Sequence, residues 1–485
     1  MHAPRNAMHR VVVIGAGITG LAAAHRMREL AAEREFPLEV LVLDRATHTG
    51  GPLATVRRDG FTIETGADSF LTEKPQAGEL ARRLGLGDDL VPTREEFRRT
   101  RVVHNGRLVD IPDGFSLMAP SRLGPVMRSE LFSPAAKLRI ALEPLVPKRK
   151  DRRDESLAAF VTRRLGREVL DRVAQPLAGG IYTADPSRLS IAATTPRFVE
   201  MEQRHGSVIR GLRIAERQRA KIVGTFARAL GTSGARFSLF YTLRNGIGSL
   251  PDALASNLGE RVRLGVEIKQ ISPRADGCTI VTESGEQISA DAVICAAPAY
   301  AAARMVRAAD PHLADLLGAI SYASAATVNM TFHESDFPAP PNSFGFVVPI
   351  IERRRIIAGS FTSLKFENRA PAGMILARVF IGGQLQTALM QLDDDAMVTA
   401  AREEFRELLG VTAAPRFAIV RRWPDSMPQY EVGHLDRVAE IERTAAAIPR
   451  VALAGAAFRG VGIPDCVRAG EQAAATILDL LARDR

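Results

Sequence analysis

The sequence contains little cysteine, few aromatic residues and no long apolar run. Its 485 residues include three cysteines, at positions 278, 295 and 466, and none belongs to a CxxC or CxxH motif. This scarcity argues against a disulfide framework and a structural zinc site, and is typical of the reducing cytoplasm. The nine histidines show no HExxH or other paired spacing, so we expect no bound metal. No apolar run approaches the ~18 residues of a membrane-spanning helix, and residues 11–20 indicate a strand and glycine turn rather than a signal peptide.

The composition fits a large globular protein. Hydrophobic residues make up 46% of the chain and charged residues 25%, and the length predicts two or three domains. The net charge is +9, and Arg122–Ile222 holds 21 Lys and Arg against 11 Asp and Glu. This basic segment has three open interpretations: a solvated helical surface, a surface attracted to anionic lipid, or one that attracts an anionic substrate. No nucleic-acid motif accompanies it, so we expect no nucleic-acid partner.

The N-terminal region has the pattern of a dinucleotide-binding βαβ unit. A β-branched run, Arg10–Ile14, is followed by the GxGxxG turn Gly15–Gly20 and by the helical pattern of Leu21–Arg34. A second apolar run, Glu39–Leu43, ends at Asp44. Strand, glycine turn, helix, strand and acid thus follow one another in the order that such a fold requires.

Each glycine of the turn has a physical role in this fold. Gly15 permits the tight turn, Gly17 lets pyrophosphate approach the backbone, and Gly20 allows helix and strand to pack closely. The helix N-terminus at Ile18 and Thr19 directs free N–H groups at the phosphates. The Asp44 carboxylate accepts hydrogen bonds from the ribose. The sequence therefore predicts a dinucleotide site.

Two further glycine segments resemble flavin-binding segments of the FAD-dependent amine oxidase superfamily. Gly50-Gly51 with Thr55 forms a GGxxxT pattern, and Gly460–Asp465 leads into the helical pattern of Cys466–Ala475. By resemblance, the second segment directs backbone N–H groups at the flavin ring, where they stabilise its reduced anion. The alternatives are an ordinary glycine loop for Gly50-Gly51 and a helix cap for Gly460–Asp465.

Two motifs resemble those of one family within this superfamily, the porphyrinogen oxidases. Gly60–Leu71 is similar to the family's GFxxExGxDSF segment, and Pro176–Pro186 with Leu189-Ser190 is similar to PLxxGIYxxDxxxLS. The chain differs from the usual pattern at Ala67, where proline is common, and at Asp44, where glutamate is common. The resemblance covers nearly the whole chain.

The resemblance implies a mixed α/β and α+β fold with three parts. A Rossmann-like FAD-binding domain, similar to that of amine oxidases and p-hydroxybenzoate hydroxylase, would comprise residues 1–74, 231–312 and 440–485. A mixed-sheet substrate domain would comprise 75–110 and 313–439, and a basic helical domain 111–230. Local patterns predict a hairpin at Arg101–Pro112, a helix at Asp394–Leu409, a strand at Val451–Ala454 and a final helix at Gly470–Leu481.

The resemblance also implies an oxygen-dependent oxidase that removes six electrons from a porphyrinogen in haem biosynthesis. Hydride leaves a meso carbon for the flavin, and each round releases hydrogen peroxide. Because the adjacent pyrrole nitrogen stabilises the developing cation, no acid–base residue is nominated. The implied cofactor-binding residues are Gly15, Gly17, Ile18, Thr19, Gly20, Asp44, Arg45, Gly51, Pro52, Thr55, Gly66, Ala67, Asp68, Ser69, Val266, Trp423, Val461, Gly462 and Ile463. The implied substrate-binding residues are Lys74, which would anchor a propionate, Gly180, Ile181, Phe346 and Phe380.

Several alternatives stay open at this stage. Lys74 has the alternative of a solvated lysine at a helix start, and Phe346 and Phe380 that of the sheet core. Coproporphyrinogen III and protoporphyrinogen IX are both candidate substrates, and the basic segment favours the more anionic coproporphyrinogen. Other functions are an amine oxidase, a carotenoid desaturase or a non-catalytic flavin-binding partner protein. By resemblance we expect a cytoplasmic monomer or homodimer, with weak peripheral membrane contact and product handover to a ferrochelatase left open.

Overall fold

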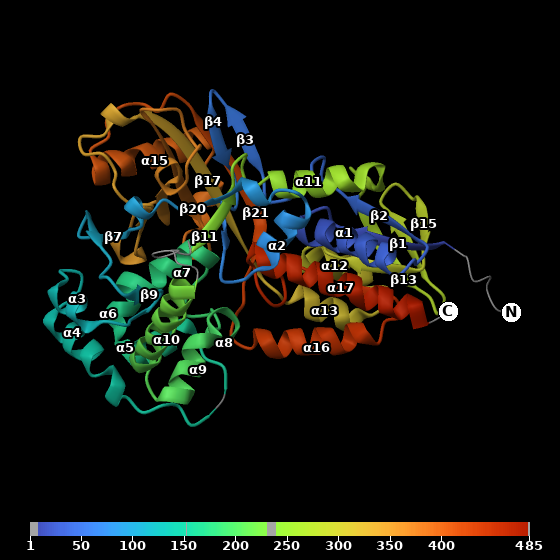
Figure 1. The fold of residues 1–485 in the computed structure, drawn as a ribbon, viewed down its shortest axis with the longest axis horizontal. Helices are drawn as coiled ribbons and strands as arrows, with labels where there is room; N and C mark the ends of the chain where they lie inside the picture. The colour runs from blue at the N-terminus through green and yellow to red at the C-terminus, as the bar shows by residue number, and fades with distance from the viewer. Residues whose placement is uncertain (1–7, 152, 230–238, 484–485) are drawn as a thin grey trace.

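The computed structural model describes residues 8–151, 153–229 and 239–483. Three parts are visible in Figure 1: a parallel sheet with its helices, a larger mixed sheet, and a group of helices that includes α3 to α10. The domain boundary predicted at 230–231 lies outside the described residues, and the other boundaries stay predictions.

The first part is built on a five-stranded sheet whose neighbouring strands all pair in parallel. The residues of β1 from Val11 to Ile14 are buried, as expected for a parallel strand covered on both faces. In sheet order the strands are β12 (Val262–Leu264), β2 (Leu38–Asp44), β1 (His9–Ile14), β16 (Ala292–Cys295) and β22 (Val451–Leu453). The sheet is therefore assembled from distant stretches of the chain.

Helices cover one face of this sheet and a small sheet lies against the other. The core on the first face includes residues of α1 (Ile18–Glu33), α2 (Gln76–Arg83), α11 (Ser249–Leu258) and α17 (Ile463–Arg483). On the second face lie antiparallel strands and three helices: β13 (Ile268–Pro273), β14 (Cys278–Thr282), β15 (Gln287–Ala290), α12 (Ala299–Val306), α13 (Pro311–Gly318) and α16 (His434–Ala446).

A seven-stranded mixed sheet forms the second part. All its pairs are antiparallel except β18 with β7. In sheet order the strands are β21 (Ala418–Pro428), β17 (Tyr322–His333), β20 (Met374–Gly382), β19 (Ala358–Phe361), β18 (Gly345–Val347), β7 (Thr100–His104) and β8 (Arg107–Asp110). Helix α15 (Asp394–Leu409) packs on one face, which leaves the other face for the remaining parts.

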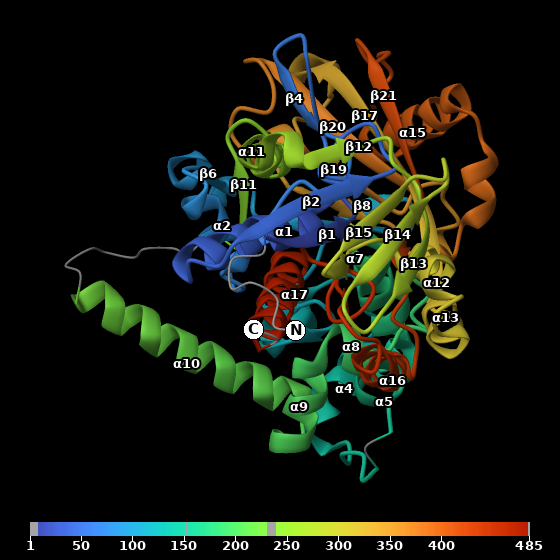
Figure 2. The ribbon, with the colours of Figure 1, turned by 90° about the vertical axis from the view of Figure 1, so that its right-hand side faces the viewer.

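The third part is helical and includes the basic segment Arg122–Ile222. Its helices are α3 (Leu123–Arg128), α4 (Pro134–Ala141), α5 (Leu157–Leu165), α6 (Arg167–Val169), a π-helical turn (Leu170–Ala174), α7 (Gln175–Tyr182), α8 (Ile191–Thr194), α9 (Pro196–His205) and α10 (Val208–Ala229). The fully buried Arg164 guanidinium bonds Glu143, which also accepts from the backbone N–H of Val208 at 3.0 Å. This buried pair fixes the start of α10, which extends outward in Figure 2. Among the helices of the described residues, none combines the length and the hydropathy that a membrane span requires.

Short elements complete the fold around the two larger sheets. They are β3 (Thr55–Arg58) with β4 (Phe61–Glu64), and β5 (Phe70–Leu71) with β11 (Phe240–Leu243) and β6 (Leu90–Pro92). The predicted helix Asp394–Leu409 and the hairpin around Asn105-Gly106 are confirmed. The final helix begins at Ile463, close to the helical pattern expected from Cys466 and earlier than the start predicted at Gly470. Gly470 is an interior packing position and not a helix start.

Candidate active site

The glycine turn after β1 forms the backbone geometry that a dinucleotide requires. Gly15 has φ +109°, and a Cβ at Gly20 would lie 1.9 Å from the Gly15 carbonyl oxygen. A Cβ at Gly17 would have no neighbour within 4 Å among the described atoms. Gly17 is the N-cap of α1 and makes no side-chain cap, so the N–H groups of Ile18 and Thr19 begin an uncapped helix. The open space at Gly17 beside this N-terminus fits a pyrophosphate.

Asp44 lies at the end of β2, directly beside this turn. Its carboxylate accepts from the backbone N–H of Ala16 at 2.5 Å and of Ala46 at 2.7 Å, and the N–H of Val266 bonds the Asp44 carbonyl at 2.8 Å. Arg45 follows and is exposed. The structure therefore brings Asp44, Arg45 and Val266 to one edge of the parallel sheet.

The GGxxxT segment lies beside the same turn. The N–H of Gly50 bonds the Ala16 carbonyl at 2.8 Å, and Gly50 forms a parallel bridge with Gly17. Gly51 has φ +57° and open space at its missing Cβ. The Thr55 hydroxyl already has protein partners, because it donates to Glu64 at 2.7 Å and accepts from the N–H of Gly248 at 2.9 Å.

The predicted flavin segment Gly66–Ser69 packs on the GGxxxT segment and under the seven-stranded sheet. A Cβ at Gly66 would lie 2.0 Å from the Pro52 carbonyl oxygen, and the N–H of Ala67 bonds that oxygen at 3.2 Å. The Thr65 carbonyl accepts from the Trp423 indole N–H at 2.9 Å and the Thr327 hydroxyl at 2.7 Å. Side chains of the seven-stranded sheet thus fix the backbone of this segment.

In the segment Gly66–Ser69, Asp68 forms a buried charge cluster with Lys365 and Arg378. Asp68 contacts Lys365 Nζ at 3.0 Å and an Arg378 nitrogen at 2.8 Å, and it accepts from the Ser69 hydroxyl at 2.6 Å. Burial alone would raise the pKa of Asp68, but Lys365 and Arg378 outweigh it and hold this pKa well below its usual range. Burial also lowers the pKa of Lys365, although the neighbouring Asp68 carboxylate acts to raise it.

Arg378 joins the flavin segment to the expected substrate wall. It donates to the Gly66 carbonyl at 2.7 Å, and its guanidinium carbon lies 4.7 Å from the centre of the Phe380 ring. The sequence analysis did not nominate Thr327, Lys365 or Arg378. An arginine inside the otherwise apolar run Met374–Gly382 is the one signal that could have indicated Arg378.

The C-terminal loop brings Lys74 to the flavin region. Lys74 Nζ lies 2.6 Å from an oxygen of Asp465 in the first turn of α17, and Arg468 bonds the other oxygen at 2.9 Å. Asp465 is 5% exposed, whereas the Lys74 side chain is 44% exposed. Lys74 is therefore paired with the segment that contains Val461–Ile463, while part of its side chain faces solvent.

The two phenylalanines expected beside the substrate lie on opposite faces of the seven-stranded sheet. Phe380 is directly cross-strand from Ala358 and packs against the same apolar core cluster as Leu177, Tyr182 and Val461. Phe346 is 2% exposed and packs with α15, its ring centre 6.4 Å from that of Phe405. A single flat ligand cannot contact both rings, so Phe346 has the sheet-core position that the sequence left as its alternative.

Gly180 and Ile181 lie at the end of α7, on the same side of the sheet as Phe380. A Cβ at Gly180 would lie 3.8 Å from Val347, which shares a sheet face with Phe380. Ile181 is 48% exposed. Their neighbour Tyr182, Phe380 and Val461 of the C-terminal loop pack against one apolar core cluster.

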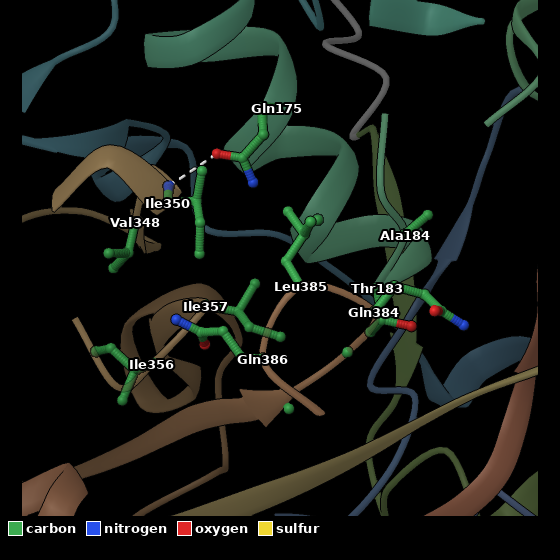
Figure 3. A pocket seen from close by; sticks show the side chains of 13 residues that line it. Gln175, Thr183, Ala184, Val348, Ile350, Ile356, Ile357, Gln384, Leu385 and Gln386 are labelled. Carbon is green, nitrogen blue, oxygen red and sulfur yellow. Dashed lines mark hydrogen bonds between the residues drawn. The ribbon is translucent and has the colours of Figure 1, made fainter. Parts of the chain in front are cut away.

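A surface pocket of about 300 Å³ lies beside this wall, between α7 and the loop after β20. Figure 3 shows Leu385 among its lining side chains and the bond from the Ile350 N–H to Gln175, which is 2.9 Å long. The lining includes Gly179 but neither Gly180 nor Phe380. It is therefore a neighbour of the predicted substrate wall and not the wall itself.

This fold and site define a flavin-binding oxidoreductase, and comparison with known proteins agrees. Residues 18–478 match the family described as flavin containing amine oxidoreductase. The chain belongs to this family. The predicted fold class, the oxidoreductase activity and FAD as cofactor are thereby confirmed, and the glycine turn, Asp44 and the open space at Gly17 fit that cofactor.

The chain is similar to porphyrinogen oxidases within this family. It is 33% identical over 475 residues to the coproporphyrinogen III oxidase of Bacillus subtilis (strain 168), covering 97% of this chain and 98% of that protein. It is also 33% identical to the coproporphyrinogen III oxidase of Propionibacterium freudenreichii subsp. freudenreichii, covering 97% and 90%. The chloroplastic protoporphyrinogen oxidase of Oryza sativa subsp. japonica is 30% identical, covering 97% and 88%. The resemblance drawn from the motifs is confirmed.

Solved structures share the whole fold. One from Exiguobacterium sp. 255-15, assigned provisionally to the protoporphyrinogen oxidases, has a TM-score of 0.84 and 30% identity and covers 98% of this chain and 99% of its own. Cyclohexylamine oxidase from Brevibacterium oxydans IH-35A has a TM-score of 0.72 at 17% identity and covers 98% and 100%. The second likeness shows the fold alone.

Proposed function

We propose that this protein oxidises a porphyrinogen to the porphyrin in haem biosynthesis, with FAD as cofactor and oxygen as electron acceptor. One observation carries the proposal: Tyr182 at the end of α7, Phe380 of the seven-stranded sheet and Val461 of the C-terminal loop all pack against a single apolar core cluster. The chain's porphyrinogen-oxidase relatives match it over nearly its full length. An apolar wall beside a flavin is the environment that a flat macrocycle requires.

The residues of this wall hold and orient the substrate. Phe380, Gly180 and Ile181 would contact the macrocycle, and Lys74 would bind a propionate by a charge-assisted hydrogen bond. The chemistry that the bound cofactor supplies is acceptance of hydride from a meso carbon, followed by return of the electrons to oxygen as hydrogen peroxide. Because a pyrrole nitrogen stabilises the carbon centre as hydride leaves, the protein needs to supply position rather than a strong base.

Coproporphyrinogen III is the substrate we propose, with protoporphyrinogen IX as the alternative. Coproporphyrinogen carries four propionates and protoporphyrinogen two, so the basic segment Arg122–Ile222 attracts the former more strongly. Two relatives at 33% identity are coproporphyrinogen III oxidases.

The test is turnover by the purified, yellow protein with each porphyrinogen, followed by porphyrin fluorescence and peroxide release. We expect oxygen to suffice as acceptor and kcat/KM to be higher for coproporphyrinogen III. A protein that cannot be loaded with flavin, or one that reacts only with an added quinone, would contradict the proposal. Higher kcat/KM for protoporphyrinogen would reverse the choice of substrate.

We also propose a cytoplasmic protein with weak peripheral contact to a membrane surface. Three leucines spaced along one side of α4 and the 3₁₀ turn after it are exposed by 61%, 43% and 73%: Leu138, Leu142 and Leu145. Apolar residues beside basic ones favour an anionic interface. Sedimentation with anionic but not neutral vesicles is expected, and a triple exchange of these leucines to serine should abolish it.

A further inference from the structure

A short segment between β21 and α16 joins the C-terminal flavin loop to the helical part. We call Gln429–His434 the bridging segment. Its residues Gln429, Tyr430 and His434 are 3%, 2% and 0% exposed. The sequence analysis assigned no role to it, and none of its residues is among those expected to touch cofactor or substrate.

Two side chains of the bridging segment bind the backbone of the flavin loop. The Tyr430 hydroxyl accepts from the N–H of Gly460 at 2.8 Å and donates to the Ala456 carbonyl at 2.5 Å. His434 Nε2 lies 2.9 Å from the Phe458 carbonyl oxygen. Because a carbonyl oxygen only accepts, this nitrogen carries the proton. Three bonds thus fix the backbone from Ala456 to Gly460, directly before Val461–Ile463.

These contacts involve stacked, electrically neutral rings. The rings of Tyr430 and His434 stack with centres 4.0 Å apart and an angle of 13° between their planes. Burial raises the pKa of the Tyr430 hydroxyl and lowers the pKa of the His434 imidazole. The phenol therefore keeps the proton that it donates and the imidazole stays uncharged, so neither ring requires a buried counter-ion.

The conformation of Gly460 gives the loop little alternative to this arrangement. Its φ is +141°, and a Cβ there would lie 2.4 Å from the Asp465 carboxyl carbon. The N–H of Gly460 is thus held between Tyr430 and the first turn of α17. A loop bonded in this way positions its next residues precisely where backbone donors are needed.

The other side of the bridging segment binds the end of the substrate wall. The Gln429 amide donates to the carbonyl of Tyr182, the last residue of α7, at 3.1 Å. The N–H of Ser190 bonds the Tyr430 carbonyl at 2.7 Å, and the N–H of Gly433 bonds Asp154 at 3.1 Å. The same six residues therefore contact both the flavin loop and the helical part.

From these contacts we infer that Tyr430 and His434 are positioning residues that hold Val461–Ile463 against the flavin, while Gln429 holds the end of α7 in register with them. This inference rests on the proposed function, in which the loop contacts the flavin and α7 contacts the porphyrinogen. Neither ring touches the reacting atoms. Each acts through the backbone that it binds.

The first test replaces Tyr430 by Phe, which keeps the ring and removes the hydroxyl. The part-buried N–H of Gly460 then loses its partner, so we expect the FAD dissociation constant to rise and kcat to fall, each about tenfold. The flavin reduction potential should become more negative, because a displaced loop stabilises the reduced anion less well. KM for the porphyrinogen should change less than about twofold, since α7 is untouched.

Two companion variants make the test specific. His434→Phe removes the bond to Phe458 and keeps a stacked ring, so it should shift the flavin potential in the same direction. Tyr300→Phe is the matched control, because Tyr300 lies on α12 in another core cluster, and we expect wild-type potential and kcat from it.

Gln429→Met tests the other side of the bridging segment. It removes the donor to Tyr182 while filling a similar volume, so KM should rise about fivefold with an unchanged flavin spectrum and potential. An unchanged potential in both Tyr430→Phe and His434→Phe would overturn the inference, and so would a shifted potential in Gln429→Met. If the wild-type protein binds no flavin or oxidises no porphyrinogen, the proposed function fails instead.

Discussion

At the scale of single residues, Lys74 pairs with one anion and is exposed enough to meet a second. Its ammonium group already bonds Asp465, and nearly half of its side chain is exposed. A propionate can approach from the exposed side without breaking the contact with Asp465, which also retains Arg468. The ion pair thus places Lys74 beside the flavin loop before substrate arrives.

Replacing Lys74 by Ala should raise KM for the porphyrinogen more than it lowers kcat. Loss of one charge-assisted contact predicts a rise in KM of about tenfold, with kcat within about twofold of wild type. Steady-state kinetics measure both constants. The exposed Lys269, on β13, provides the control, Lys269→Ala, with kinetics like the wild type. An unchanged KM in Lys74→Ala would reject the anchoring role.

Asp68 is the residue on which the buried cations depend. In Asp68→Asn, Lys365 and Arg378 lose their buried counter-ion, so unfolding at pH 7 should need about 3–5 kcal/mol less free energy. Because its folded pKa is depressed, the wild-type contribution is complete above the unfolded pKa of about 3.9 and is lost as pH falls below it. The difference between the two proteins should therefore narrow in acid.

Denaturant titration at several pH values measures these differences. The control is Asp110→Asn, because Asp110 forms an exposed pair with Arg101 at 3.0 Å and should contribute less than about 1 kcal/mol. Equal stability of Asp68→Asn and wild type at pH 7 would show that the cluster does not depend on this carboxylate.

At the scale of elements, alanine substitutions at two glycines of the turn after β1 should have different effects. Gly20→Ala places a Cβ 1.9 Å from the Gly15 carbonyl oxygen, so it should lower the thermal stability of the flavin-free protein. Gly17→Ala meets no protein atom within 4 Å in the described structure, so it should fold normally yet bind FAD about tenfold more weakly or worse. Calorimetry of the apoprotein and titration with FAD separate the two effects, and equal behaviour would contradict these roles.

Sequence patterns predicted elements well where local chemistry decides them. The apolar run and glycine turn predicted β1 and α1, and the hairpin at Asn105-Gly106 follows from turn chemistry. The start of α17 was misplaced because Gly470 resembles a helix boundary. Its glycine is instead required where α17 crosses α1, since a Cβ would lie 2.2 Å from the Thr19 carbonyl oxygen. A close approach of distant helices leaves no periodic signal.

The sequence could indicate the glycines and acids of the candidate site, but it gave little indication of the residues that hold them in place. Asp44 and the turn at Gly15 carry a local motif, whereas Lys365 bonds Asp68, 297 residues away, and Tyr430 bonds Gly460, 30 residues away. The placement of Phe346 required strand register, because neighbouring residues of a strand face opposite sides. Hydrophobicity alone does not distinguish the two faces.

At the scale of the whole molecule, charge should govern the choice between substrates. The basic excess in Arg122–Ile222 raises the local concentration of an anionic substrate, an effect that salt screens. Raising ionic strength should therefore lower kcat/KM more steeply for coproporphyrinogen III than for protoporphyrinogen IX. Rates measured with both substrates over a salt series test this, and equal slopes would assign the basic excess to another role.

The parallel sheet also constrains when the protein can mature. Its edge strand β22 and the helix α17 lie more than 400 residues after β1 in the sequence, so the predicted flavin pocket is complete only when these late elements have joined the sheet. A protein shortened before Val451 should therefore remain colourless however well its other parts fold.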